Sequence, residues 1–255
     1  MNSSLSDGVA VKINLIKELG YDLSPQSLIL DFGCGGGKRV QELNASGYQA
    51  FGCDFQFQAA EDADTENLWR KKIIRLLDAK AYVLPFEDNT FDFIFSEQVF
   101  EHVQNYSQTI SEIERVLKPT GFCLHIFPSR YKPIEPHVYV PFSSIIGSYG
   151  WLYFWSMLGI RNEFQEGLSA KETAKRNYVY LRNNTNYLSK KKIVAAFKAR
   201  FSDVIFCEER FLKCLTSRKG RYVYALSKVL RFLPLLYSAF NTRVVFTGGP
   251  RHQKK

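Results

Sequence analysis

A glycine-rich loop behind an acidic residue is the part of this sequence best suited to chemistry. The run Asp31-Phe32-Gly33-Cys34-Gly35-Gly36-Gly37 begins at the end of the short apolar segment Ser27–Phe32, which is typical of a buried strand. It leads into a predicted helix. Glycines turn the backbone tightly and let a ligand approach without a Cβ in the way. Asp54 ends the next predicted strand, 23 residues after Asp31, where a carboxylate can accept hydrogen bonds from ribose hydroxyls. Lys38 occupies the third-glycine position of the dinucleotide fingerprint, which disfavours NAD.

Histidine changes its charge near neutral pH, and two histidines follow predicted strands. His102, beside Glu101, comes after the fourth predicted strand, and His137 comes after the fifth and is the better candidate on the substrate side. We expect one of the two to be a general base, with a structural hydrogen-bonding role as the alternative for His102. His125 lies within a predicted strand and is expected to be packed. Glu135 and His137 could ligate a metal, but no third ligand is visible, so no metal site is predicted.

The first 128 residues alternate between predicted helices and strands, and the strands would position these side chains. Helices are expected over Val9–Leu19, Lys38–Ala45 and Ser107–Leu117, and strands over Ser27–Phe32, Gln49–Asp54, Ile73–Leu77, Phe91–Phe95 and Phe122–Phe127. Two later strands are expected at Ser202–Cys207 and Thr242–Phe246. This order predicts an α/β fold with a doubly wound, Rossmann-like, mostly parallel seven-stranded sheet.

The alternation stops at Pro128. Val138–Ile160 is 23 residues long, without a charge and rich in aromatic residues. Its length could span a bilayer, but Pro141 and three glycines make it a poor spanning helix, and a single span would divide one sheet between two sides of a membrane. We therefore predict that residues 129–188 form a helical, aromatic lid after the fifth strand, or an interfacial helix.

The charges are distributed unevenly along the chain. Residues 1–127 hold 11 Lys+Arg and 18 Asp+Glu, a balance of −7, and residues 128–255 hold 23 and 7, a balance of +16; the two sum to +9. Two of the basic segments, Ser189–Arg200 and Arg221–Phe240, mix cations with apolar residues. A basic half indicates an anionic partner such as phosphate, lipid head groups or nucleic acid, with solubility alone as the alternative.

Cysteine usage and the first residues bear on the compartment. The five cysteines form no C-x-x-C pair, which argues against a disulfide framework or zinc ribbon and fits a reducing compartment. Met1–Gly8 is polar and lacks an apolar core, so no secretory signal is expected. We expect a cytoplasmic protein, either free or peripheral at the inner face of the membrane.

Four segments, in order over residues 9–128, resemble the class I S-adenosylmethionine-dependent methyltransferases. LILDFGCGGGKRV resembles their glycine-rich first motif, and FGCDFQ the end of the second strand with its ribose-binding acid. LPFEDNTFDFIFSEQVFEHV resembles the segment around the fourth strand, and ERVLKPTGFCLHIF the helix, turn and fifth strand that follow. The most similar branch is the broad type 11 group, which acts on small molecules, sugars and lipids.

The resemblance implies S-adenosyl-L-methionine as the cofactor and gives the loop residues their roles. Gly33, Gly35 and Gly37 would line the methionine part of the cofactor. Asp31 would orient the loop and reach the cofactor's amino group through water.

The same resemblance assigns the residues at the ends of the next strands. Asp54 would hold the ribose, and Phe55 would pack beside the adenine. Asp78 is the candidate for the acid at the adenine edge, with a turn acid as the alternative. Ser96 and Glu97 would face the methionine end.

We expect a methyltransferase that acts on a small-molecule, sugar or lipid-linked acceptor, such as a cell-envelope polysaccharide precursor, close to an anionic membrane surface. Residues 1–128 would be the cofactor-binding half, 129–188 the lid, and 189–255 the rest of the sheet with a basic helical segment. An RNA methyltransferase is one alternative, although no RNA-binding module is recognisable and nucleic acid is not the expected partner. A non-catalytic cofactor-binding scaffold protein is the other, and an NAD oxidoreductase ranks behind both.

Overall fold

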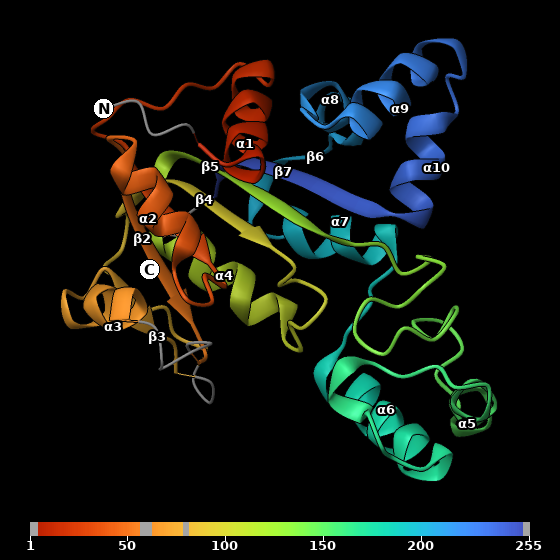
Figure 1. The fold of residues 1–255 in the computed structure, drawn as a ribbon. Helices are drawn as coiled ribbons and strands as arrows, with labels where there is room; N and C mark the ends of the chain where they lie inside the picture. The colour runs from red at the N-terminus through yellow and green to blue at the C-terminus, as the bar shows by residue number, and fades with distance from the viewer. Residues whose placement is uncertain (1–4, 57–62, 79–81, 252–255) are drawn as a thin grey trace.

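A seven-stranded sheet forms the centre of the computed structural model, which describes residues 5–56, 63–78 and 82–251 (Figure 1). The strands are β1 (Leu28–Phe32), β2 (Gln49–Asp54), β3 (Ile74–Leu76), β4 (Phe91–Glu97), β5 (Leu117–Pro128), β6 (Phe201–Phe206) and β7 (Thr242–Pro250). Their order is β3-β2-β1-β4-β5-β7-β6, and only β7 runs antiparallel to its neighbours. The predicted doubly wound, mostly parallel sheet is confirmed.

Helices cover both faces of this sheet (Figure 1). They are α1 (Asp7–Glu18), α2 (Lys38–Ala45), α3 (Ala63–Arg70), α4 (Tyr106–Val116), α5 (Tyr149–Met157), α6 (Ala170–Asn184), α7 (Lys190–Lys198), α8 (Glu208–Cys214), α9 (Arg218–Val229) and α10 (Leu233–Phe240). Apolar residues of α1, α2 and α8 pack on one face, and those of α4 and α7 on the other. β1 is apolar along most of its length because helices cover both faces of the sheet. Ile29 packs in the core on the α1 side, and Leu30 packs in the core on the α4 side.

The segment after β5 builds a small core of its own. Val138, Val140, Leu152, Ala174 and Leu181 are buried together between α5, α6 and the chain before them. The indole Nε1 of Trp151 in α5 donates to the carbonyl of Pro141 at 2.7 Å. This bond ties α5 to the chain segment before it. Figure 1 shows α5 and α6 side by side beyond the end of β5.

The uncharged stretch 138–160 contributes a single helix of nine residues, α5. None of the helices in the described part of the chain combines the length and the apolar character that crossing a bilayer requires.

The structure contains two short helices that the sequence pattern did not predict, α3 with eight residues and α8 with seven. Helices this short carry little periodicity, and packing against neighbours decides whether they form. The expected basic segment Arg221–Phe240 divides into α9 and α10, because the helix ends before Leu230 and restarts at Leu233 with Pro234 in its first turn.

Candidate cofactor and acceptor site

A cleft of about 900 Å³ opens at the carboxyl ends of β1, β2 and β4, where the strand order reverses. Ligands of doubly wound sheets bind at such a switch point. The lining residues are Phe32, Gly33, Cys34, Gly35, Gly36, Lys38, Arg39, Cys53, Asp54, Phe55, Gln56, Leu77, Glu97, Gln98, Val99, His102, Val103, Tyr180, Asn183 and Asn184. The last three come from α6, so the segment after β5 supplies one wall of the cleft.

The glycine loop forms the floor of the cleft and is tied to the next strand. The amides of Gly33 and Cys34 donate to the carbonyl of Cys53 at 2.8 and 3.1 Å. Gly35 has a φ of +54°, and a Cβ there would meet no atom within 4 Å. A side chain at Gly35 would therefore project into open space in the cleft, so a ligand can approach the backbone there.

Gly37 serves packing rather than the cleft. It has a φ of +80° at the start of α2, and a Cβ would lie 2.7 Å from Leu68 Cδ1. It is absent from the lining of the cleft, although the sequence pattern had grouped it with Gly33 and Gly35.

Asp54 lies beside this loop with room for a further partner. Its Oδ2 accepts from the amide of Gly35 at 2.8 Å, and its Oδ1 accepts from the amide of Phe55 at 2.7 Å. Each carboxylate oxygen can accept a second hydrogen bond, as a ribose diol requires. The ring of Phe55 is partly exposed beside it and lies edge to face with Tyr82, at 5.9 Å between centroids.

Four charged side chains lie behind and beside the glycine loop. Lys12 of α1 donates to Glu97 Oε2 at 2.6 Å, and Arg39 Nε lies 3.3 Å from Asp31 Oδ2. Asp31 is fully buried, and neither of its oxygens has a hydrogen-bond partner. Burial raises the pKa of its carboxyl to about 7 even though Arg39 and Lys12 oppose the shift. Burial also acts to raise the pKa of Glu97, but the bonded Lys12 outweighs it and the net shift is downward.

Besides Gly37 and His137, three of the residues assigned from the sequence lie outside the lining. Asp31 is enclosed behind the loop. Ser96 points away from the cleft because side chains alternate along a strand, and its Oγ lies 2.8 Å from His125 Nδ1. Asp78 pairs by its backbone with Val83, and its neighbour Leu77 lines the cleft instead. Gly33, Gly35, Asp54, Phe55 and His102 do line it.

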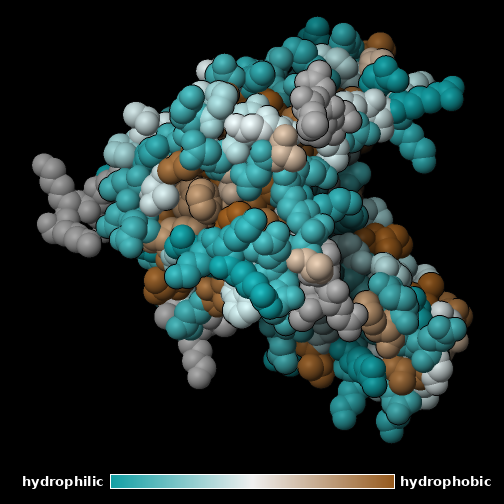
Figure 2. All heavy atoms as spheres, turned by 60° about the vertical axis from the view of Figure 1, so that its left-hand side comes forward, coloured by the Kyte–Doolittle hydropathy of each residue, from teal (hydrophilic) through white to brown (hydrophobic). Residues whose placement is uncertain are grey.

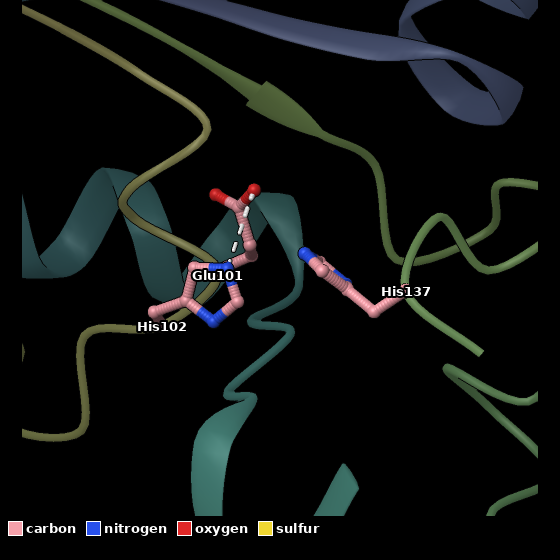
Figure 3. Close-up of side chains that lie close together, drawn as sticks. All are labelled: Glu101, His102 and His137. Carbon is pink, nitrogen blue, oxygen red and sulfur yellow. Dashed lines mark ion pairs between the residues drawn. The ribbon is translucent and has the colours of Figure 1, made fainter. Parts of the chain in front are cut away.

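Beyond the cleft, the two histidines singled out from the sequence come together. The rings of His102 and His137 lie 4.7 Å apart between centroids, at 72°. Figure 3 shows His137 reaching toward Glu101 and His102 from the opposite side. His102 Nε2 lies 4.0 Å from Glu101 Oε1.

Each imidazole of this pair is held at Nδ1. His137 Nδ1 lies 2.7 Å from Glu135 Oε1, and His102 Nδ1 lies 2.7 Å from the carbonyl of Asn184. A carboxylate and a carbonyl only accept hydrogen bonds, so Nδ1 carries a proton in both rings, and in a neutral ring the lone pair is then on Nε2. Burial lowers the pKa of His102, which favours the neutral imidazole.

Two carboxylates on this side have opposite surroundings. Glu135 accepts from the amides of His137 and Val138 and from the hydroxyl of Tyr187. Burial acts to raise its pKa, but these hydrogen bonds outweigh it and the pKa is lowered. Glu101 is buried with no hydrogen-bond partner for either oxygen, and burial raises its pKa to about 7.

No sequence pattern groups Lys12 with Glu97 or Tyr187 with Glu135, because these partners lie 85 and 52 residues apart. Tyr180 was visible only as one of many aromatic residues. Arg39 stands two residues after the last glycine of the loop, and this closeness to the loop and to Asp31 is the one local signal that could have identified it.

Comparisons with known proteins agree with this geometry. Residues 30–125 match the family model described as "Methyltransferase domain", of the type 11 group. The glycine/sarcosine/dimethylglycine N-methyltransferase of Actinopolyspora halophila is 31% identical over 114 residues, which cover 42% of this chain and 20% of that protein. The sterol 24-C-methyltransferase erg6 of Schizosaccharomyces pombe is 33% identical over 104 residues, 39% of this chain and 27% of that one.

Among solved structures, phosphoethanolamine N-methyltransferase 2 of Haemonchus contortus shares the fold, with a TM-score of 0.51 at 19% identity. The match covers 94% of this chain and 52% of that chain. This chain therefore spans between a fifth and about half of the length of the proteins it matches.

A doubly wound sheet with a glycine loop after the first strand and an acid at the end of the second defines a nucleotide-cofactor-binding α/β domain. Over residues 30–125 this domain matches the methyltransferase domain model of the type 11 group, the class that its motifs predicted. S-adenosyl-L-methionine is the methyl donor of this class, and the residues present fit it. Gly35 leaves space for the ligand, and both oxygens of Asp54 can still accept.

Proposed function

We propose that this chain is an S-adenosylmethionine-dependent methyltransferase whose acceptor enters beside His102 and His137. The bound cofactor supplies a methyl group on a sulfonium, which is already activated for an in-line displacement. The observation that supports the proposal most is the pair formed by Gly35 and Asp54, in which the loop amide is fixed on Oδ2 and the space in front of the glycine is open. Donor and acceptor held in line account for roughly 7–11 kcal/mol of the barrier in favourable cases.

In this proposal Asp54 accepts the ribose hydroxyls and Phe55 packs on the adenine. Lys12, Arg39 and Glu97 form the charged wall at the other end of the loop, where the amino and carboxyl groups of a methionine need partners. Asp31 acts on that wall through Arg39 and is a positioning residue.

His102 and His137 are the residues that we propose as catalytic. His102 lines the cleft, and the ring of His137 packs against His102 and Tyr180. Both histidines can therefore touch an acceptor that lies in the cleft beside Tyr180. Each is oriented through Nδ1, by Asn184 and Glu135, which leaves Nε2 for the acceptor.

The acceptor that fits the rest of the molecule is a lipid or lipid-linked compound at an anionic membrane surface. The helices α9 and α10 expose Tyr222, Leu226, Val229, Phe232, Leu235, Leu236 and Phe240. The cations Arg218, Lys219, Arg221, Lys228 and Arg231 are exposed beside them, and residues 210–250 contain no Asp or Glu. Apolar side chains with cations beside them are what binds the headgroup region of anionic bilayers.

The position of α10 connects this surface with the cleft. The amide of Ser129, just after β5, donates to the carbonyl of Asn241, just after α10. The helix therefore ends at the edge of the sheet on which the cleft opens, and Figure 1 shows α10 and α6 on the same side of the molecule. The similarity to a sterol 24-C-methyltransferase also supports a lipid acceptor.

The cofactor proposal is tested by calorimetric titration of the whole chain with S-adenosylhomocysteine. Gly35→Ala is expected to weaken binding at least tenfold, since the methyl group enters the cleft. Gly47→Ala is the matched control: it also has a positive φ, of +90°, with no atom within 4 Å, and it should bind like the wild type. His137→Gln should keep its affinity and lose turnover. Absence of binding to the wild type would overturn the proposal.

A further inference from the structure

The side chains of Glu101, His102 and His137 form a cluster of possible metal ligands, and Glu101 has no part in the methyl transfer proposed above. One ligating atom from each lies within 4.8 Å of the other two. Zinc bonds to nitrogen and oxygen of about 2.0–2.2 Å place neighbouring ligands of a tetrahedral ion about 3.4 Å apart, so small side-chain rotations would close the cluster on an ion. Two histidines and one carboxylate are a common ligand set for divalent transition metals that keep open positions.

The surroundings of both imidazoles match those of metal ligands. Metal-binding histidines almost always donate their other N–H to a carboxylate or a backbone carbonyl, which fixes the tautomer and the ring. His137 has the carboxylate of Glu135 at Nδ1, and His102 has the carbonyl of Asn184. Tyr187 donates to the same oxygen of Glu135, so this outer partner is itself held in place.

Glu101 provides an independent observation. Its side chain is 1% exposed, and neither oxygen has a hydrogen-bond partner among the described residues. A buried carboxylate without a partner is costly unless a charge lies close to it. Figure 3 shows that a ring nitrogen of each histidine is turned toward the carboxylate of Glu101.

We propose that Glu101, His102 and His137 bind one divalent transition-metal ion of the zinc class at the junction between the cleft and the lid. His102 also lines the cleft. The ion, bound through Nε2 of both imidazoles, would replace a free histidine base and present an open position to an oxygen donor of the acceptor, such as a hydroxyl or a phosphate. The role toward the acceptor rests on the proposed function, but metal binding itself does not.

The experiment titrates the full chain with Zn²⁺ in a calorimeter, after removal of metals with a chelator. The wild type is expected to bind one ion per chain with a Kd of micromolar or below. Glu101→Gln should bind at least tenfold more weakly, and Glu135→Gln should lose about 10–100-fold through the outer hydrogen bond. Glu163→Gln, an exposed lid residue outside the cluster, is the control and should bind like the wild type.

Far-ultraviolet circular dichroism of the same samples shows whether each variant is folded, and S-adenosylhomocysteine binding is measured separately. The metal proposal is overturned if the folded wild type takes up no zinc, or if Glu101→Gln takes it up equally well. Zinc uptake without S-adenosylhomocysteine binding would instead overturn the cofactor proposal and leave the metal site standing.

Discussion

At the scale of single residues, environment separates groups of the same type. His102 and His137 are partly exposed and oriented through Nδ1, whereas His125 is fully buried within β5. The ring of His125 stacks on Phe197 at 5.3 Å between centroids, and its Nδ1 lies 2.8 Å from Ser96 Oγ. The prediction that His125 is packed is confirmed.

The burial of His125 should make the free energy of unfolding depend on pH. Burial lowers the pKa of His125 from 6.5 to about 3. Between these pH values the unfolded chain binds a proton at this residue and the folded chain does not, so stability falls as the pH drops. From pH 7 to pH 5 the loss is about 2 kcal/mol, at about 1.4 kcal/mol per pH unit below 6.5. In urea unfolding at both pH values, His125→Gln should lose less stability than the wild type by about this amount.

The other titrating groups are common to both proteins, so the difference isolates His125. Equal pH dependence of the two proteins would show that the folded state accommodates the imidazolium.

At the scale of elements, α6 brings the segment after β5, which we propose to be a lid, up to the cleft. It begins with a capping box, in which the hydroxyl of Ser169 accepts from the amide of Glu172 and the Glu172 side chain accepts from the amide of Ser169. Its last turn carries Tyr180 and Asn184 to the cleft wall. Beyond it, the amide of Asn186 donates to the carbonyl of Glu101, which fixes the exit of the lid on the turn after β4.

Removal of the cap should loosen this helix without affecting the sheet. Ser169→Ala is expected to cost about 1 kcal/mol, seen as faster hydrogen exchange of α6 amides with unchanged protection in β4 and β5. Ser217→Ala, which removes the same kind of cap from α9, is the control and should leave α6 unaffected. If Ser169→Ala speeds exchange throughout the sheet, the lid and the sheet unfold as one unit.

At the scale of the whole molecule, apolar residues remain exposed on two sets of helices. The lid exposes Tyr153, Phe154, Met157, Leu158 and Phe164, and Figure 2 shows apolar side chains on the lobe that stands out from the main body at lower right. The second set is the cationic face of α9 and α10. Contiguous apolar patches on a protein surface mark interaction sites.

Flotation with vesicles tests the membrane part of the proposed function. The chain should float with anionic phosphatidylglycerol vesicles at low salt and detach as salt rises, because exposed charges are screened. Val229→Glu and Leu235→Glu should reduce flotation at least threefold, and Trp69→Glu, an exposed aromatic on α3, should not. Equal binding to neutral vesicles, or salt-sensitive RNA binding in place of flotation, would contradict the membrane proposal.

The sequence by itself determined the sheet, the glycine loop and the acid that follows it. These features are local: β2 has the predicted bounds Gln49–Asp54, because a short segment bounded by turn residues indicates a strand. The positions of Gly35 and Asp54 follow directly from the ends of two adjacent parallel strands.

Only the tertiary structure decided which side chains meet across the cleft. His137 stands 35 residues after His102, and they converge because the lid folds back onto the turn after β4. Glu101, the carboxylate of the proposed metal site, is next to His102 in the sequence, but nothing in the sequence marks it as a ligand. Its burial without a partner depends on packing from distant segments, and long-range packing leaves no periodic signal in the chain.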